Sequence, residues 1–232
     1  MLPNYSIAAD AESLQKNFSI QVNEDHKGTY NAQPTDLLPV ITSLDPEVLS
    51  YFHWGITPSF TKSKSVSLKL LFAAVEEIHQ KASQRKSIQQ RRCIIPADSF
   101  YDWKDLGKRE QIPYRFYLQN NQAFGIAGIW DVFETAEGEE VNTFTIITTE
   151  ANQEVKPVSD RMPAILNEDL MVEWLNHSNS SDSILEFVVP YRELPILSYT
   201  INPKLSDPNF NNQSLWEKTP PANQFGNLTL FN

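Results

Sequence analysis

Short apolar runs that alternate with polar residues, separated by turn-forming residues, are the dominant pattern of this chain. Alternation with a period of two is typical of half-buried strands, and β-branched and aromatic residues are frequent in these runs. The pattern predicts strands at residues 39–42, 51–56, 92–96, 114–118, 124–130, 144–148 and 197–200. Asn120 and Asn121 lie between the fourth and fifth of these runs, which predicts that the two strands pair as a hairpin.

Helical spacing is confined to a few segments, and residues 65–81 have the strongest helical pattern. Neither Pro nor Gly interrupts this segment, and its apolar residues share one side: Leu68, Leu71, Phe72, Val75 and Ile78. Asp10 and Asn167 have the chemistry and the position of helix N-caps. Shorter helices are therefore predicted after Asp10 and at residues 168–175, and another is predicted at residues 181–187.

The order of these elements indicates a fold class. Strands and hairpins outnumber β-α-β units, which favours an α+β fold with a largely antiparallel, curved or barrel-like sheet and flanking helices. The sequence contains no repeat, no low-complexity tract and no linker. We therefore expect a single domain over residues 1–232.

Composition excludes several classes of protein. Cys93 is the one cysteine, so an intrachain disulfide is impossible, and a reducing, cytoplasmic compartment is expected. Its place in an apolar strand predicts a buried, inert thiol. The first residues do not form a signal peptide, and no run approaches the roughly 20 apolar residues of a membrane helix. Without a Gly-rich phosphate loop or metal-ligand spacing among the four His, neither a cofactor nor a metal is predicted.

The charge of the chain is acidic but unevenly distributed. The net charge is −10, whereas nucleic-acid-binding proteins usually have a basic surface that neutralises phosphates. Residues 59–92 nevertheless hold eight basic residues against two acidic ones. Two interpretations stay open: a solvated helix face beside a loop, or a local anion-binding surface on an otherwise acidic protein.

Five segments carry more specific information than the composition does. They read YNAQPT at residues 30–35, WGITP at 54–58, RRCIIPADSFYDW at 91–103, IITTEAN at 146–152 and DRMPAIL at 160–166. In this order, they resemble motifs of the SOS-response-associated peptidase-like family, whose members act on abasic sites in single-stranded DNA. The best-matched core runs from about residue 30 to residue 175.

The resemblance implies a specific chemistry. Members of the family expose a cysteine at position 2, whose α-amine and thiol condense with the aldehyde of an opened abasic site to close a thiazolidine ring. A Glu and a His move the protons of this reaction, and an Asn and an Arg hold the phosphate or sugar beside the lesion.

This chain differs from the family at every one of those positions. Leu2 stands in place of the cysteine, Phe72 and Ala74 in place of the Asn and Arg, Asp102 in place of the Glu, and Ser159 in place of the His. Other residues that the resemblance places at the site are retained: Trp54, Thr148 and Arg161. The leading hypothesis is therefore a non-catalytic relative that acts by binding or regulation, with an unknown protein partner.

Two alternatives stay open. In the first, the basic stretch binds single-stranded DNA weakly and without a cross-link, Trp54 or Trp103 offers a stacking face, and Thr148 and Arg161 line the site. In the second, Asp102 together with Ser159 or Thr148 supports a residual peptidase, hydrolase or lyase activity.

Overall fold

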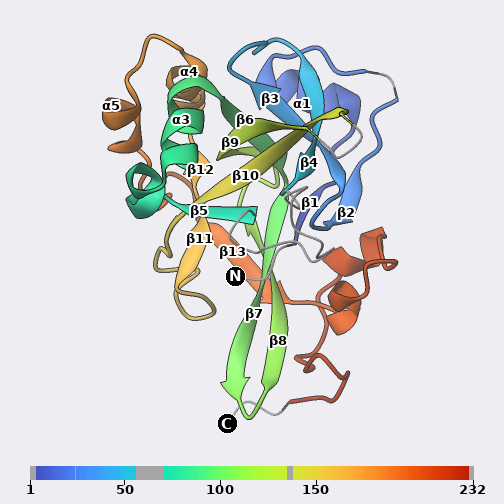
Figure 1. Cartoon of the computed structure of the whole chain (residues 1–232). Coiled ribbons are helices and arrows are strands. Elements are labelled where there is room, and N and C mark those ends of the chain that lie inside the picture. The colour runs from blue at the N-terminus through green and yellow to red at the C-terminus, as the bar shows by residue number, and fades with distance from the viewer. Residues whose placement is uncertain (1–3, 24, 56–70, 135–137, 230–232) are drawn as a thin grey trace.

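Five strands close into a small barrel in the upper half of the molecule as drawn in Figure 1. The computed structural model describes residues 4–23, 25–55, 71–134 and 138–229. The barrel strands are β3 (Leu37–Thr42), β4 (Leu49–Trp54), β6 (Arg92–Ala97), β9 (Phe124–Glu134) and β10 (Glu140–Glu150). They pair in the order β4-β3-β6-β9-β10, and β10 returns to β4 through a short parallel pairing that closes the ring.

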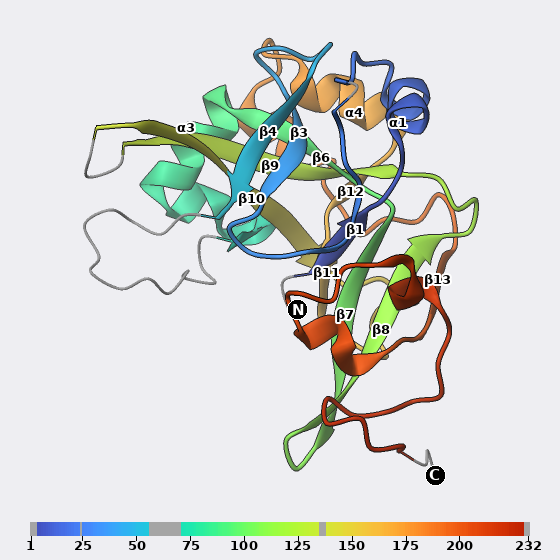
Figure 2. The same cartoon turned by 90° about the vertical axis from the view of Figure 1, so that its right-hand side faces the viewer.

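A second, antiparallel sheet lies beside the barrel and extends away from it (Figures 1 and 2). Its strands, in spatial order, are β13 (Ile196–Thr200), β8 (Glu110–Leu118), β7 (Ser99–Gly107), β1 (Tyr5–Ile7) and β2 (Thr29–Ala32). The chain passes from barrel strand β6 to β7 through a single residue, Asp98. This direct connection fixes the two sheets against each other at the start of β7.

Three short strands extend the barrel sheet. β5 (Phe72–Ala74) runs parallel to β10, β11 (Arg161–Pro163) runs antiparallel to β10, and β12 (Ile165–Leu166) pairs with β9. Because β5 and β11 both bind the second half of β10, segments far apart in the sequence meet there.

The α-helices lie around the barrel, whereas two of the 3-10 helices lie beside the second sheet (Figure 1). The 3-10 helices are η1 (Val75–Gln80), which follows β5, and η2 (Pro203–Ser206) and η3 (Gln213–Trp216), which contact β8 and β2. The α-helices are α1 (Ala11–Phe18), α3 (Ala82–Gln90), α4 (Glu168–Leu175) and α5 (Ser181–Leu185). The buried Arg92 guanidinium holds two of them by donating to the carbonyl oxygens of Ile88 (2.9 Å), Trp174 (2.5 Å) and Asn176 (2.5 Å). These bonds satisfy carbonyls at the C-terminal ends of α3 and α4. In the part of the chain that the structure describes, no helix is long and apolar enough to cross a membrane.

The predicted fold class is confirmed, and so are several elements. The structure is α+β, with a largely antiparallel sheet closed as a barrel. Helix α4 has the predicted bounds, and the Asn167 side chain caps it by accepting a hydrogen bond of 2.7 Å from the Leu170 amide. Asp10 caps α1 in the same way, through the Ser13 amide at 2.9 Å.

The predicted helix at residues 65–81 is wrong beyond Leu71. Residues 65–70 lie outside the described residues, Leu71 is helical, residues 72–74 form strand β5, and residues 75–80 form a 3-10 helix. Pairing with residues 146–148 gives the backbone of Phe72–Ala74 its hydrogen bonds, so tertiary contact overrides the helical apolar pattern.

The predicted hairpin between residues 114–118 and 124–130 is also wrong. β8 pairs with β7 and β13, whereas β9 pairs with β6, β10 and β12, so the turn at Asn121 connects two different sheets. Alternation identifies a strand, but the partner of a strand is decided by which long-range contacts bury its apolar face.

Gly128 of β9 allows a close approach inside the barrel. A Cβ atom at this position would overlap Cδ1 of Ile95 and lie 3.0 Å from Sγ of Cys93 and 3.1 Å from the Thr145 carbonyl oxygen. We expect Gly128→Ala to destabilise the protein by about 1–3 kcal/mol in urea unfolding, since a backbone atom cannot move aside.

Gly125→Ala is the matched control on the same strand. Its Cβ would meet side-chain atoms alone, the Met171 sulfur at 2.5 Å and Cγ2 of Ile94 at 2.8 Å, and a thioether repacks readily. We expect a smaller loss for Gly125→Ala, and equal losses for the two variants would contradict this account of barrel packing.

Candidate functional site

The second half of β10 brings together four of the residues that the sequence singles out. Thr148 pairs with Ala74 of β5 on one side and with Pro163 of β11 on the other. Phe72 pairs with Ile146 two positions earlier, and Arg161 pairs with Glu150 two positions later. Phe72, Ala74, Thr148 and Arg161 thus occupy three adjacent strands, which we call the β5–β10–β11 site.

Arg161 is held from two sides. Its Nη2 donates to the carbonyl oxygen (2.6 Å) and the hydroxyl (3.1 Å) of Thr148. Its Nη1 and Nη2 also donate to the two carboxylate oxygens of Glu76, each at 3.0 Å, in a bidentate pair. Partial burial raises the pKa of Glu76, but the hydrogen bond and charge of Arg161 outweigh it, so the net shift of the pKa is downward.

Phe72 and Trp54 fill the adjoining space with aromatic rings. Phe72 meets Trp54 edge to face, with the ring centroids 5.7 Å apart and an interplanar angle of 87°. The indole also stacks on Phe144, and its Nε1 donates to the Leu71 carbonyl oxygen at 3.2 Å. Trp54 is 1% exposed, so its ring is a packing element in this structure and offers no open face for stacking on a base.

Asp102 and Ser159 come from different elements, strand β7 and the segment before β11. Asp102 lies in β7 of the second sheet, is buried, and accepts a hydrogen bond of 2.8 Å from the Trp103 amide. Ser159 is half-buried just before β11, and its hydroxyl accepts from the Arg161 amide at 3.3 Å. Leu2 lies outside the described residues. The catalytic roles given to these positions stay predictions.

Comparison with known proteins identifies the family. The family model described as SOS response associated peptidase matches residues 1–208. The chain belongs to this family. Among curated relatives, it is similar to the abasic site processing protein YoaM of Bacillus subtilis, at 35% identity over 82% of this chain and 85% of YoaM. It is also similar to YoqW of the same organism, at 31% identity over 94% of this chain and 99% of YoqW.

Solved structures share the fold of this chain. A crystal structure of a protein from Bacteroides thetaiotaomicron has a TM-score of 0.81 at 27% identity, and the match covers 93% of this chain and 99% of that one. A second crystal structure, from Bordetella bronchiseptica, shows the same fold with a TM-score of 0.72 at 24% identity. The single-domain organisation over residues 1–232 stays a prediction, since the family model ends at residue 208.

The family motif around Asp98 fixes the N-terminal segment to the sheet. The Asp98 carboxylate accepts hydrogen bonds from the Ser6 hydroxyl (2.5 Å) and from the amides of Ala8 (2.6 Å) and Ala9 (3.1 Å). Further along, the Tyr101 amide donates to the Asn4 carbonyl oxygen at 3.2 Å. Burial raises the pKa of Asp98 although these hydrogen bonds and Arg115 lower it. The family scaffold therefore holds residues 4–9 along the start of β7.

Three of the eight basic residues in the stretch at residues 59–92 make internal contacts. Arg91 pairs with Asp131 and lies 5.3 Å from the ring of Trp130, and Arg92 is buried. Lys81 pairs with Glu77 at 3.2 Å, while Arg85 and Lys86 are exposed on α3. The remaining lysines of the stretch fall outside the described residues: Lys62, Lys64 and Lys69. Within the described ranges, His, Cys, Asp and Glu form no group of three or more that could hold a metal.

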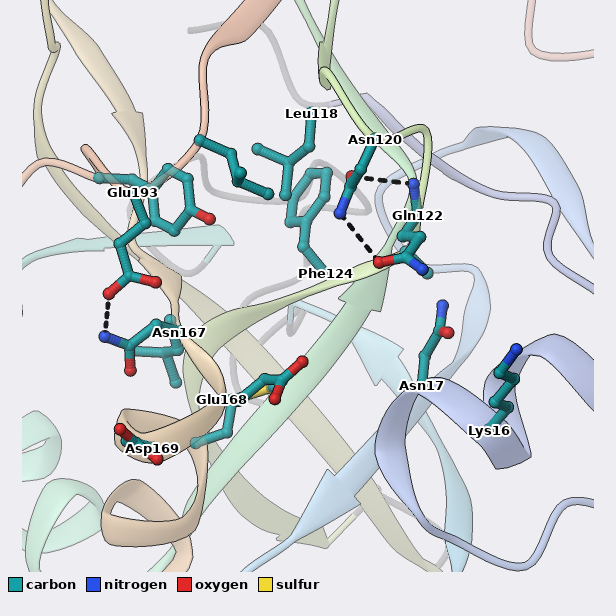
Figure 3. Close-up of a pocket in the computed structure, with 15 residues that line it drawn as sticks. Lys16, Asn17, Leu118, Asn120, Gln122, Phe124, Asn167, Glu168, Asp169 and Glu193 are labelled. Atoms are coloured by element: carbon teal, nitrogen blue, oxygen red, sulfur yellow. Dashed lines mark hydrogen bonds between the residues drawn. The ribbon is translucent and has the colours of Figure 1, made fainter.

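A cavity of about 640 Å³ lies elsewhere, between α1, the β8–β9 turn and the start of α4 (Figure 3). Glu168 projects toward its centre, and Asn120 and Gln122 bond to each other on the opposite wall (Figure 3). Its lining does not include the residues of the β5–β10–β11 site. Acidic residues at the first turn of α4 also stabilise the helix dipole, so their presence there does not require a ligand.

We expect Asp98→Asn to lower the free energy of unfolding by about 1–3 kcal/mol, because an amide cannot accept all the hydrogen bonds that the carboxylate accepts. Hydrogen exchange of the amides of residues 5–9 should accelerate more than exchange elsewhere. Asp10→Asn, an acid-to-amide change on the same segment, should be nearly neutral because Asn caps a helix as well as Asp does. Unchanged exchange at residues 5–9 in Asp98→Asn would contradict the anchoring role.

Proposed function

We propose that this chain is a non-catalytic member of its family, which acts by binding or regulation and not by covalent reaction with abasic DNA. The observation that carries the proposal is the position of its one cysteine. Cys93 is fully buried in barrel strand β6, and burial raises the pKa of its thiol well above the ordinary value. A thiazolidine needs a thiol and a free amine on adjacent carbons, and the nitrogen of Cys93 is a strand amide, bonded within the sheet.

The surroundings of the β5–β10–β11 site support the same conclusion. At the positions where the family has Asn and Arg, Phe72 packs on Trp54 and Ala74 has no polar group. The Arg161 guanidinium is engaged by Glu76 and Thr148. A site with an aromatic ring in place of the amide and an alanine in place of the arginine lacks two of the groups that hold a phosphate beside a lesion, and Glu76 occupies its remaining guanidinium in the resting protein.

The relatives supply the context. YoaM and YoqW are named abasic site processing proteins, so we propose that this chain also serves the response to DNA damage, in the cytoplasm and with a protein partner or DNA as its ligand. Non-covalent binding of single-stranded DNA is the second candidate. It is favoured by the partial exposure of Arg161, whose side chain is 30% accessible.

The hydrolytic alternative has less support. The hydroxyls of Ser159 and Thr148 both accept hydrogen bonds from Arg161. An arginine side chain stays protonated and a peptide amide holds its proton, so neither donor can take a proton from a hydroxyl. Activation of either hydroxyl by Asp102 stays a prediction that a hydrolase assay on peptide and ester substrates can test.

The proposal predicts that the wild-type protein, incubated with single-stranded DNA that carries one abasic site, forms no product that survives a denaturing gel. A variant with Leu2→Cys, Phe72→Asn, Ala74→Arg, Asp102→Glu and Ser159→His should regain a cross-link, since the anchoring of residues 4–9 by Asp98 is retained. The same variant without Leu2→Cys is the matched control and should give no cross-link.

A cross-linked band with the wild-type protein would contradict the proposal, because another nucleophile would then perform the reaction. A folded variant with all five substitutions and no cross-link would contradict the claim that the scaffold still presents the reactive segment correctly. Circular dichroism of each variant separates that result from misfolding.

A further inference from the structure

The contact between Glu76 and Arg161 is the most defined ionic contact of the β5–β10–β11 site. Both carboxylate oxygens of Glu76 lie 3.0 Å from guanidinium nitrogens of Arg161, although the two residues are 85 positions apart. Glu76 lies in η1, which directly follows β5, and Arg161 is the first residue of β11. The pairing of both strands with β10 brings the carboxylate to the guanidinium.

The Glu76 carboxylate occupies the guanidinium in the manner of a phosphate. A guanidinium binds two oxygens of a carboxylate or of a phosphate through the same planar pair of N–H groups. Thr148 independently holds Nη2 through its carbonyl oxygen and hydroxyl. If the carboxylate leaves, the guanidinium is still positioned by Thr148, and its freed N–H groups are oriented for another oxyanion.

The pair is open to solvent on its outer side. The side chains of Arg161 and Glu76 are 30% and 51% accessible. Ion pairs with such exposure are weak, because water and salt screen them, so a competing anion can displace one partner. The neighbouring Lys156 is already paired with Asp160 at 2.9 Å. At this site, the Glu76 carboxylate and an incoming phosphate therefore compete directly for the Arg161 guanidinium.

We propose that Glu76 is an autoinhibitory carboxylate, which occupies Arg161 and must be displaced before the phosphodiester backbone of a single-stranded nucleic acid binds at this site. The inference rests on the proposed function, since a covalent reaction would retain DNA whatever the strength of this contact. It adds to that function a means by which affinity is kept low in the resting protein.

Glu77 offers a matched control in the next position of η1. It pairs with Lys81 at 3.2 Å and belongs to the same 3-10 turn. Glu77→Gln removes the same charge as Glu76→Gln at nearly the same place, without changing the contacts of Arg161. Both variants share any gain in affinity that comes from weaker electrostatic repulsion of the oligonucleotide. A gain that comes from release of Arg161 is expected in Glu76→Gln alone.

The test is the equilibrium affinity for a fluorescently labelled single-stranded oligonucleotide without abasic sites, measured by anisotropy at several salt concentrations. We expect Glu76→Gln to bind about fivefold more tightly than Glu77→Gln, the order expected for release from one exposed pair. The salt dependence of Glu76→Gln should steepen by about 0.7 in the log–log slope, corresponding to one additional phosphate contact. The double variant Glu76→Gln with Arg161→Gln should lose the gain.

Equal affinities for Glu76→Gln and Glu77→Gln, a gain that persists without Arg161, or no binding by Glu76→Gln at low salt would each overturn the inference. None of these outcomes alters the proposed absence of covalent reaction, which the denaturing gel decides separately. Competition by inorganic phosphate distinguishes the sources of the anion. If inorganic phosphate displaces the oligonucleotide at a concentration equal to that of the oligonucleotide's own phosphate groups, the freed guanidinium binds small phosphate ligands in general.

Discussion

The exchange of pairing partners along strand β10 is the constraint on which the candidate site depends. In its first half, β10 pairs with β9 on one edge and with β4 on the other, and these pairings close the barrel. From residue 146 onward, β5 takes the place of β4, and from residue 148 onward, β11 takes the place of β9. One continuous strand therefore builds the core with one half and the β5–β10–β11 site with the other.

This arrangement explains why aromatic rings pack at the site. Trp54 ends β4 and Phe72 begins β5, so the two rings meet where one partner of β10 replaces the other. A polar side chain at position 72 would need its own hydrogen-bond partners beside a buried indole. Phe72 instead contributes apolar contact area against Trp54, at the position where the resemblance to the family predicts a ligand-binding amide.

We propose that this chain keeps the scaffold of its family without the family's chemistry. Motif residues that hold the fold together keep their contacts: Arg92 binds the ends of two helices, and Asp98 binds the N-terminal segment. The positions that the resemblance associates with reaction are replaced, and one of them is now part of the core packing. Retention of the first set explains why the chain matches the family over most of its length.

The sequence predicts the elements whose signals are local. The bounds of α4 follow from the Asn167 cap and the spacing of its apolar residues, and alternation locates most barrel strands. The prediction fails at residues 72–74, because their apolar spacing is helical while their hydrogen bonds come from β10. The pairing partners of the strands cannot be predicted from local signals either, since β8 and β9 are adjacent in sequence but belong to different sheets.

The same limit applies to the candidate site. The motifs identify Thr148 and Arg161 by resemblance, and the structure places them in contact. The contact of Glu76 with Arg161 could not be predicted in this way, because nothing in the segment around Glu76 indicates a partner in β11. The pair forms because the two strands beside these residues, β5 and β11, both bind β10. Long-range register, which decides such contacts, has no signature in a single segment of sequence.

Whether the protein reacts covalently is decided by its intact mass after incubation with an abasic oligonucleotide, measured with and without borohydride reduction. The unmodified mass is expected in the unreduced sample because the only thiol of the chain is buried in the barrel. It is expected in the reduced sample because a protein that acts by binding alone forms no imine with the abasic aldehyde. An oligonucleotide adduct in the unreduced sample would mean that this fold still performs a stable covalent reaction. An adduct in the reduced sample alone would mean that an amine forms a transient imine, and either result would contradict the account.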